Sequence, residues 1–278
     1  MTEHNRRLLA HLMRRAGFGA TSSELDELSE ISYEDVVDNL LDPLDESWMG
    51  EHLIRRFHHE QSGMMSAFGP SEYWLYQMVT TKAPLIEKMT LFWHNHFANN
   101  ETKVRDYRKL LLQNETFRIH ATGNFRDLLI AIAKDPAMLY FLDAGQNIKG
   151  SPNENFAREI MELFTLGVGN YEEKDIREAA RAFTGWNTND LEFVVNKDLH
   201  DNESKTILNK TGNFSGEDVI DILLSQKAAS KFIVKKLYKE FVNENINDDI
   251  ISDYAHVLEQ NNFELKPLLA AIFSSKDF

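Results

Sequence analysis

Three polar residues recur at helical spacing within an apolar stretch of the chain: Asn155, Glu159 and Glu162. Residues three and four positions apart lie on one side of a helix, so these side chains form a strip along one edge. Leu163 and Leu166 flank that edge, which predicts partly buried carboxylates that need a partner. The chemistry open to such a strip is metal binding through oxygen atoms, acid–base catalysis, or an ion-pair network.

Histidine is the second residue type that could take part in this chemistry. His94 and His96 form a His-x-His pair at the end of a segment with helical periodicity, TLFWHNHF. Side chains two positions apart on a helix point about 200° apart, so we expect the two imidazoles to face opposite ways. His96 shares the apolar stripe, where a histidine is more often a hydrogen-bonded core residue than a metal ligand.

These residues define a candidate site between helices. The candidate catalytic residues are Glu159, His96 and Asn155, with Glu159 as general base and His96 as general acid. The candidate metal ligands are His96, Glu159, Glu162 and Asp143. A ligand set of oxygen and imidazole without thiolate suits a divalent metal ion such as Mg, Mn, Fe or Zn, and a bound ion could activate water for hydrolysis.

A structural role competes with these hypotheses. An arginine would then pair with the carboxylates, and the resulting network would fix how the helices cross. The sequence favours this role, because ion-pair networks perturb carboxylates as often as active sites do. Four arginines are candidate partners: Arg118, Arg158, Arg177 and Arg181.

The helix that positions the strip has clear start signals. Ser151 is a favourable N-cap, Pro152 suits the first helical position, and Glu154 stands where a capping box places its acid. We therefore expect a helix over residues 151–167, with Glu154 engaged in capping. The segment from Thr21 to Glu24 predicts a second capping box near the N-terminus.

Composition predicts a mainly α fold. The chain has 278 residues, of which 42% are hydrophobic, and it contains 18 Phe but only 13 Gly and 6 Pro, which favours helices over a turn-rich β protein. We expect a multi-helix globular bundle with one short β-hairpin near residues 191–208, built from strands at 192–196 and 205–208. A single domain over 1–278 is expected, and the alternative is a 1–190 core with a 209–278 helical extension.

Charge and residue usage bear on partners and location. The net charge of −14 disfavours nucleic-acid binding, because the chain repels phosphate backbones. Cysteine is absent, which excludes disulfides, thiolate nucleophiles and zinc–thiolate sites. No apolar run approaches the length of a membrane span, and the N-terminal residues lack the apolar region of a secretory signal. A soluble, cytoplasmic protein is the default expectation.

Several segments resemble a bacterial family called domain of unknown function 1800. The most specific of them is NENFAREIMELFTLG, which contains the predicted strip. The segments that carry the resemblance are HLMRRAGFGAT (11–21), EKMTLFWHNHFA (87–98), GNFRDLLIAIAKDPAMLYFLD (123–143), SPNENFAREIMELFTLGVGNY (151–171), REAARAFTGW (177–186), and TGNFSGEDVIDILL with KFIVKKLYKEFV (211–242).

The resemblance implies a protein without an assigned reaction and with a polar inter-helix pocket centred on the 151–167 helix. Family motifs centre on His94, His96, Asp143, residues 153–162 and Trp186. Members look longer than this chain, and their genes often lie beside those of an exported, sulfatase-like family (domain of unknown function 1501). The resemblance thus implies a sulfatase-like partner and possible export. The alternative is a hydrolase, metal-dependent or acid–base, that uses the histidine and carboxylates named above.

Overall fold

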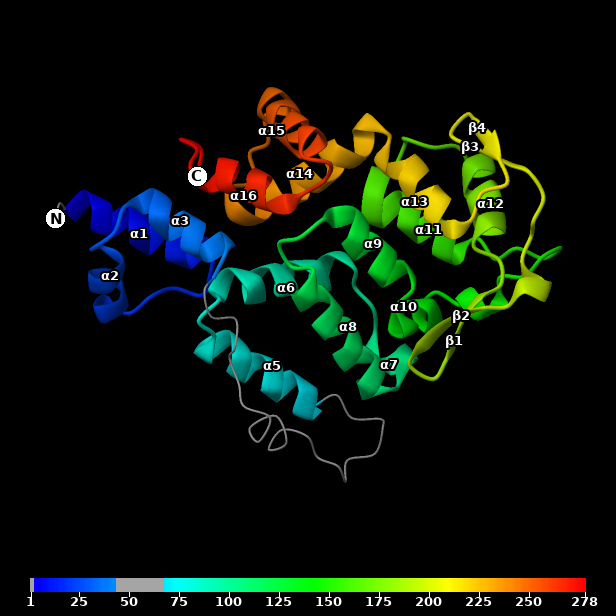
Figure 1. Ribbon diagram of the computed structural model, residues 1–278, viewed down its shortest axis with the longest axis horizontal. Helices are drawn as coiled ribbons and strands as arrows, with labels where there is room; N and C mark the ends of the chain where they lie inside the picture. The colour runs from blue at the N-terminus through cyan, green and yellow to red at the C-terminus, as the bar shows by residue number, and fades with distance from the viewer. Residues whose placement is uncertain (1–2, 44–67) are drawn as a thin grey trace.

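A computed structural model describes residues 3–43 and 68–278 of the protein (Figure 1). This part of the chain is mainly helical, as the composition predicts. The first helices are α1 (Glu3–Arg15), α2 (Ser22–Leu28), α3 (Tyr33–Leu41), α5 (Phe68–Thr80), α6 (Pro84–His96), α7 (Glu101–Val104), α8 (Tyr107–Ile119), α9 (Phe125–Ala133) and α10 (Pro136–Phe141). The later ones are α11 (Asn155–Met161), a π-helical turn η2 (Glu162–Leu166), α12 (Glu173–Ala182), α13 (Gly216–Leu224), α14 (Lys227–Phe241), α15 (Asp248–Gln260) and α16 (Leu265–Phe273).

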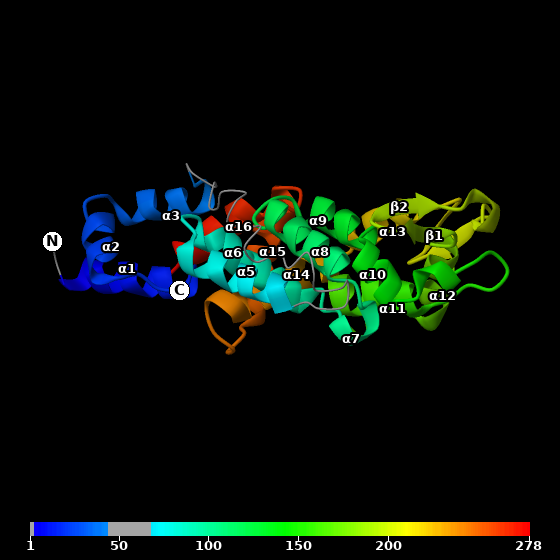
Figure 2. The same ribbon diagram turned by 90° about the horizontal axis from the view of Figure 1, so that it is seen from below.

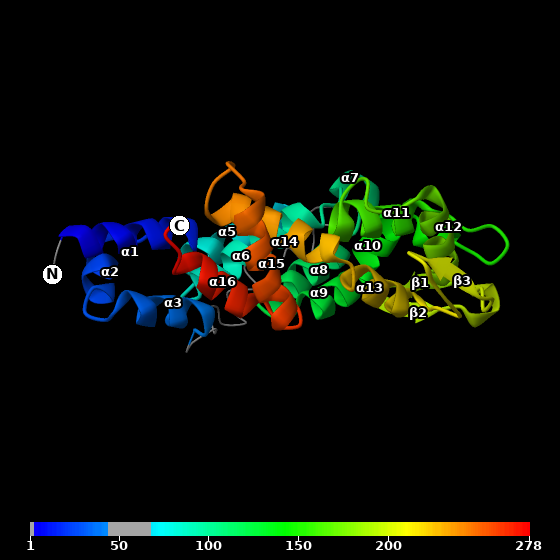
Figure 3. The same ribbon diagram turned by 90° about the horizontal axis from the view of Figure 1, so that it is seen from above.

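The molecule is elongated, with the N-terminal helices at one end and the strands at the other (Figures 1, 2 and 3). In Figure 1, α14, α15 and α16 lie above α6, α8 and α9, and α5 lies below them. The view from below places α5 in front of this middle layer, in agreement with that order (Figure 2). No helix of the described part is both long and apolar enough to cross a membrane.

Aromatic side chains fill the middle of the core. The indole of Trp93 in α6 is fully buried, stacks on Phe125 with ring centroids 5.6 Å apart, and donates its N–H to the Ala121 carbonyl at 2.8 Å. Phe97 stacks on Phe117 in the same way, at 6.0 Å. Offset aromatic pairs of this kind stabilise a core beyond the area that they bury, and here they fix α6 against α8 and α9.

The β structure consists of two antiparallel hairpins in the described residues. The strand pairs are β1 (Trp186–Asn189) with β2 (Glu192–Val195), and β3 (Lys205–Ile207) with β4 (Lys210–Gly212). The sequence predicts strands at 192–196 and 205–208, and both are present, but each pairs with its own neighbour and not with the other. Leu208 and Asn209 explain the second hairpin, because both have positive φ (47° and 64°), as a two-residue hairpin turn requires.

The start of α11 also differs from the prediction. The helix begins at Asn155, four residues after Ser151. Asn147 Oδ1 accepts the Asn153 backbone N–H at 3.0 Å, and Asn153 Oδ1 accepts the Asn155 N–H at 2.9 Å. Two amide side chains therefore organise this helix start, and Glu154 makes no capping hydrogen bond.

Candidate functional site

The two histidines of α6 have different surroundings, as their spacing predicts. His96 is 8% exposed, lies among aromatic rings, and shares a hydrogen bond of 3.1 Å between Nε2 and the Phe164 carbonyl. Burial, together with the positive charge of Lys236, lowers the pKa of His96 to about 3. The ring is therefore neutral at neutral pH. Nε2 must carry its proton, because a carbonyl only accepts, and Nδ1 has no partner among the described residues.

Glu159 is half-buried in α11, as the polar strip predicts. Burial raises the pKa of its carboxyl, the nearby Glu162 raises it further, and Arg158 acts in the opposite direction. The Arg158 guanidinium is turned toward other carboxylates, since it pairs with Glu173 at 2.8 Å and with Glu154 at 3.1 Å. Glu159 therefore keeps a raised pKa beside a like charge.

The other predicted site residues have partners of their own. Within residues 3–43 and 68–278, no group of three or more His, Asp or Glu side chains lies close enough together to hold a metal ion. A metal site built from His96, Glu159, Glu162 and Asp143 thus stays a prediction from the sequence. The individual contacts are Tyr171 hydroxyl to Glu162, Asn155 Nδ2 to the Leu142 carbonyl at 3.2 Å, and Lys103 Nζ to Asp143 at 2.8 Å.

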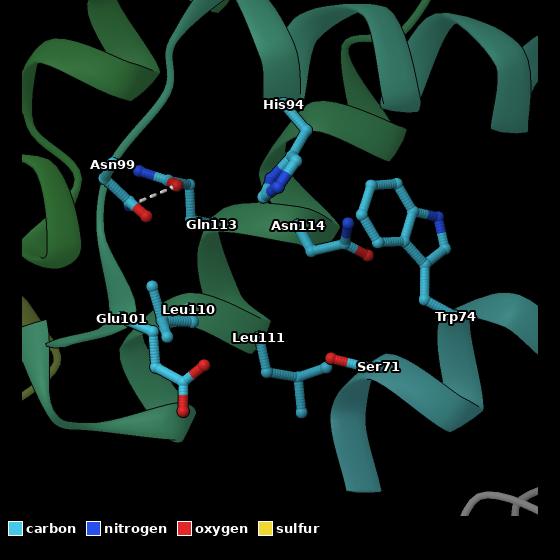
Figure 4. A pocket seen from close by; sticks show the side chains of 9 residues that line it. All are labelled: Ser71, Trp74, His94, Asn99, Glu101, Leu110, Leu111, Gln113 and Asn114. Carbon is cyan, nitrogen blue, oxygen red and sulfur yellow. Dashed lines mark hydrogen bonds between the residues drawn. The ribbon is translucent and has the colours of Figure 1, made fainter. Parts of the chain in front are cut away.

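A cavity with both polar and apolar walls lies between α5, α6, α7 and α8 (Figure 4). The polar pocket expected along the 151–167 helix stays a prediction. The volume of the cavity is about 220 Å³. It is lined by Ser71 and Trp74 of α5, His94 of α6, Asn99 of the following loop, Glu101 of α7, and Leu110, Leu111, Gln113 and Asn114 of α8.

A buried ion pair stands behind this cavity. Arg118 of α8 and Glu87 of α6 are 8% and 2% exposed, and the guanidinium donates two parallel hydrogen bonds to the carboxylate, at 2.6 and 3.2 Å. The second carboxylate oxygen also accepts the indole N–H of Trp74 at 3.0 Å. Arg118 donates a further bond to Asn114 Oδ1 at 2.8 Å. One ion pair therefore orients two walls of the cavity.

The Asn114 amide has a fixed orientation because of this contact. A guanidinium only donates hydrogen bonds, so the atom that faces Arg118 must be the amide oxygen. The NH₂ group then lies on the opposite side, beside His94 and Trp74 at the cavity (Figure 4). Its nitrogen is buried and has no partner among the described residues. A buried donor without a partner costs about 1–3 kcal/mol. Less than 1 Å² of this nitrogen is exposed, so a ligand acceptor reaches it only when a neighbouring side chain such as His94 turns aside.

A second chain of hydrogen bonds fixes the opposite wall. Asp135 Oδ1 accepts from Gln113 Nε2 at 2.7 Å, and Gln113 Oε1 accepts from Asn99 Nδ2 at 2.6 Å. Asn99 uses its nitrogen in this chain, so its oxygen is left as an acceptor on the cavity wall. Burial raises the pKa of Asp135 to about 7, although hydrogen bonds from the Met138 backbone and Gln113 lower it.

His94 completes the polar lining. Its ring packs edge-on against Trp74, with centroids 5.1 Å apart. The ring remains accessible from the cavity, yet the surrounding protein lowers its pKa by desolvation. The imidazole is therefore neutral at neutral pH, and it offers one donor and one acceptor.

The cavity is a candidate site that reasoning from the sequence does not find. The signal that could have found it is a second stripe on α6, formed by Glu87, Thr90 and His94 at positions i, i+3 and i+7. Glu87 and Thr90 are both buried, so this helix is apolar on one side and buried-polar on another. Arg118, expected as a partner for the α11 carboxylates, pairs here with Glu87.

Comparison with known proteins gives one match. A family model described as "Protein of unknown function (DUF1800)" matches residues 11–278. No curated protein and no solved structure matches the chain. The matched range contains every residue of the cavity and of the α11 strip.

Proposed function

The chain belongs to the DUF1800 family of proteins of unknown function, and from this premise we propose that it binds a small polar molecule in the cavity between α5, α6, α7 and α8. The observation that carries the proposal is the Asn114 NH₂ group, which is buried at the cavity and has no partner in the described part of the chain. The Glu87–Arg118 pair supports it further. Because these side chains are already held in place before a ligand arrives, less of the binding free energy is lost in ordering them.

The test is ligand-induced stabilisation. A chemically diverse set of small molecules is screened for compounds that raise the melting temperature of the protein, since a ligand that binds only the folded state must do so. We expect binders for the wild type, and a markedly smaller stabilisation by the same compounds in Asn114→Ala. Asn261→Ala is the matched control, because that amide bonds the Val257 carbonyl in α15 instead of lining the cavity. Equal stabilisation of both variants would overturn the proposal.

Acid–base or metal-assisted hydrolysis by Glu159 and His96 is a second proposal. Its support is the raised pKa of the half-buried Glu159, a property of carboxyl groups that act as general acids or bases. The neutral, buried ring of His96 weighs against its role as the acid. The tests are a panel of ester substrates and metal content by plasma mass spectrometry. Hydrolysis, or a stoichiometric metal, that persists unchanged in Glu159→Gln would contradict this version.

A sulfatase-like protein partner and an exported location are further proposals, and their support is the family resemblance. Co-expression with a sulfatase-like protein of the family that the resemblance implies, followed by size-exclusion chromatography, tests the first. A shared peak that survives at about 1 M salt, where the Debye length is about 3 Å, is the expected result. Separate elution of the two proteins at low and at high salt would count against the partner.

A further inference from the structure

The charges of the described residues that line the cavity disfavour anionic ligands. The described residues that line it include no lysine and no arginine, and Glu101 is the one with a formal charge. Arg118 lies behind the wall and is engaged by Glu87 and Asn114. A phosphate, sulfate or carboxylate would therefore lose its hydration without gaining a cation. The net charge of −14 repels such groups as well.

The hydrogen-bonding groups favour hydroxyls over amines. Asn114 holds a buried donor without a partner in the described chain, behind the rings of His94 and Trp74, and Asn99 and Glu101 present acceptors. An ammonium group only donates, so it cannot satisfy Asn114. A hydroxyl both donates and accepts, and several hydroxyls on one ligand can satisfy both walls at once.

The remaining walls fit a compact carbon skeleton. Trp74, Leu110 and Leu111 give the cavity an aromatic and an aliphatic side, and the indole is held in place by its bond to Glu87. The volume of about 220 Å³ equals the share of roughly seven water molecules in the liquid, at ~30 Å³ each. That space suits a single six-membered ring with its hydroxyl substituents.

We propose that the cavity binds a neutral polyhydroxylated ring of monosaccharide size, such as a pyranose or a cyclitol, with a ring hydroxyl accepting from Asn114 and the C–H face of the ring against Trp74. This inference rests on the proposed function, small-molecule binding at the same cavity. It adds the chemical class of the ligand.

The test is titration calorimetry with three matched sets of rings: neutral monosaccharides and inositol, the corresponding amino sugars, and the corresponding uronic acids. We expect at least one neutral ring to bind, and its uronic acid counterpart to bind at least tenfold more weakly. Asn114→Ala should weaken the neutral ring about tenfold, the effect of one hydrogen bond of ~1.4 kcal/mol.

A pair of variants on α8 locates the binding site. Leu111→Phe adds volume to the cavity wall, whereas Leu112→Phe adds the same volume at a neighbouring position that does not line the cavity. We expect Leu111→Phe to abolish binding and Leu112→Phe to bind as the wild type does. Neutral-ring binding that is unchanged in Leu111→Phe would overturn the inference.

The outcomes separate the ligand class from the proposed function. Preferential binding of amino sugars, uronic acids or molecules without hydroxyls, sensitive to Leu111→Phe, would overturn the inference about hydroxylated rings and leave small-molecule binding standing. Failure of every compound, those of the diverse set included, would overturn both.

Discussion

At the scale of single residues, the buried pair formed by Glu87 and Arg118 links the stability of the core to the walls of the cavity. Burying the two charges costs desolvation free energy, and the two parallel hydrogen bonds between them offset part of that cost. The pair is also the shared support of Trp74 and Asn114. Loss of one partner would leave the other charge buried and would release both walls of the cavity.

We predict that Glu87→Ala lowers the free energy of unfolding by about 3–5 kcal/mol, the range for a broken buried pair. The control is Asp221→Ala, which breaks an exposed pair with Arg126 and should cost about 0–1 kcal/mol. Urea unfolding of the three proteins measures both changes. Similar losses in the two variants would show that the buried pair has no special weight.

A second prediction concerns Asp135 and pH. Its folded pKa of about 7 lies above the value of ~3.9 expected in an unfolded chain. Between these values the folded protein holds a proton that the unfolded chain has lost, so stability falls as pH rises through this window. The contribution of Asp135 is complete below about pH 4 and is lost by about pH 8.

Asp135→Asn should remove this contribution, because an amide does not titrate and its oxygen can still accept the bonds from Met138 and Gln113. We expect the urea midpoint of the variant, relative to wild type, to rise between pH 5 and pH 8. His96 and other groups titrate in both proteins, so the difference between them isolates Asp135. A difference that stays constant with pH would contradict the raised pKa.

At the scale of elements, the π-helical turn η2 sets the geometry at the end of α11. The Thr165 hydroxyl donates to the Ile160 carbonyl at 2.7 Å, and the Gly167 N–H reaches the Glu162 carbonyl at 3.0 Å, both five residues back. The widened turn leaves the Phe164 carbonyl to His96. Turns of this kind are frequent at functional sites, and this one ends the predicted polar strip.

Gly167 is required by this turn. Its φ of 77° and ψ of 163° form a combination that side-chain-bearing residues rarely adopt, and an added Cβ would lie 3.0 Å from the Phe232 ring. We predict that Gly167→Ala lowers the melting temperature more than Gly169→Ala, where φ is 89° but nothing lies within 4 Å of the added atom. Phe232→Leu should restore part of the melting temperature lost in Gly167→Ala. If the effects of the two substitutions on the melting temperature simply add in the double variant, the clash is excluded.

The elements that the sequence predicts are those decided by local signals. The capping box at Thr21 and Glu24 is present because both residues lie within one turn of the helix that they start. The start of α11 was predicted wrongly, because Asn147, a residue outside the helix, holds Asn153 at the cap.

The candidate site is harder to predict because it, too, depends on contacts between residues that lie far apart in the sequence. The α11 strip follows from helical periodicity, and its half-buried Glu159 matches that expectation. The cavity depends on contacts across 13 to 31 positions, such as Trp74 to Glu87 and Glu87 to Arg118. The periodicity of a single helix does not indicate which buried charge on one helix pairs with which charge on another.

At the scale of the whole molecule, the first helices of the described chain pack against the last ones (Figure 3). Arg15 of α1 donates to the carbonyls of Glu240, Phe241 and Val242 at the end of α14, at 2.7 to 2.9 Å. The Tyr33 hydroxyl of α3 donates to the Phe273 carbonyl of α16 at 2.9 Å. Buried apolar residues form one cluster from α1 to α16.

We propose from these contacts that residues 1–278 fold as a single domain and that 209–278 is no separable extension. We predict that the fragments 1–212 and 213–278, made separately, lack near-ultraviolet dichroism and a cooperative thermal transition. The intact chain should unfold in one transition. A fragment 1–190 that melts cooperatively by itself would instead support the alternative of a core with an extension.

The hydrogen bond from Arg15 to Phe241 spans 226 positions of the chain. During synthesis, Arg15 is therefore made long before its partner. At roughly 5–20 residues per second, a ribosome needs about 10–45 s to produce the second partner after the first. During that interval Leu9 and Leu12 of α1, both buried in the finished protein, lack the later helices that share their core cluster. Nascent chains should therefore depend on a chaperone that shields newly made N-terminal helices, and release from it should wait for α14 and α16 to emerge.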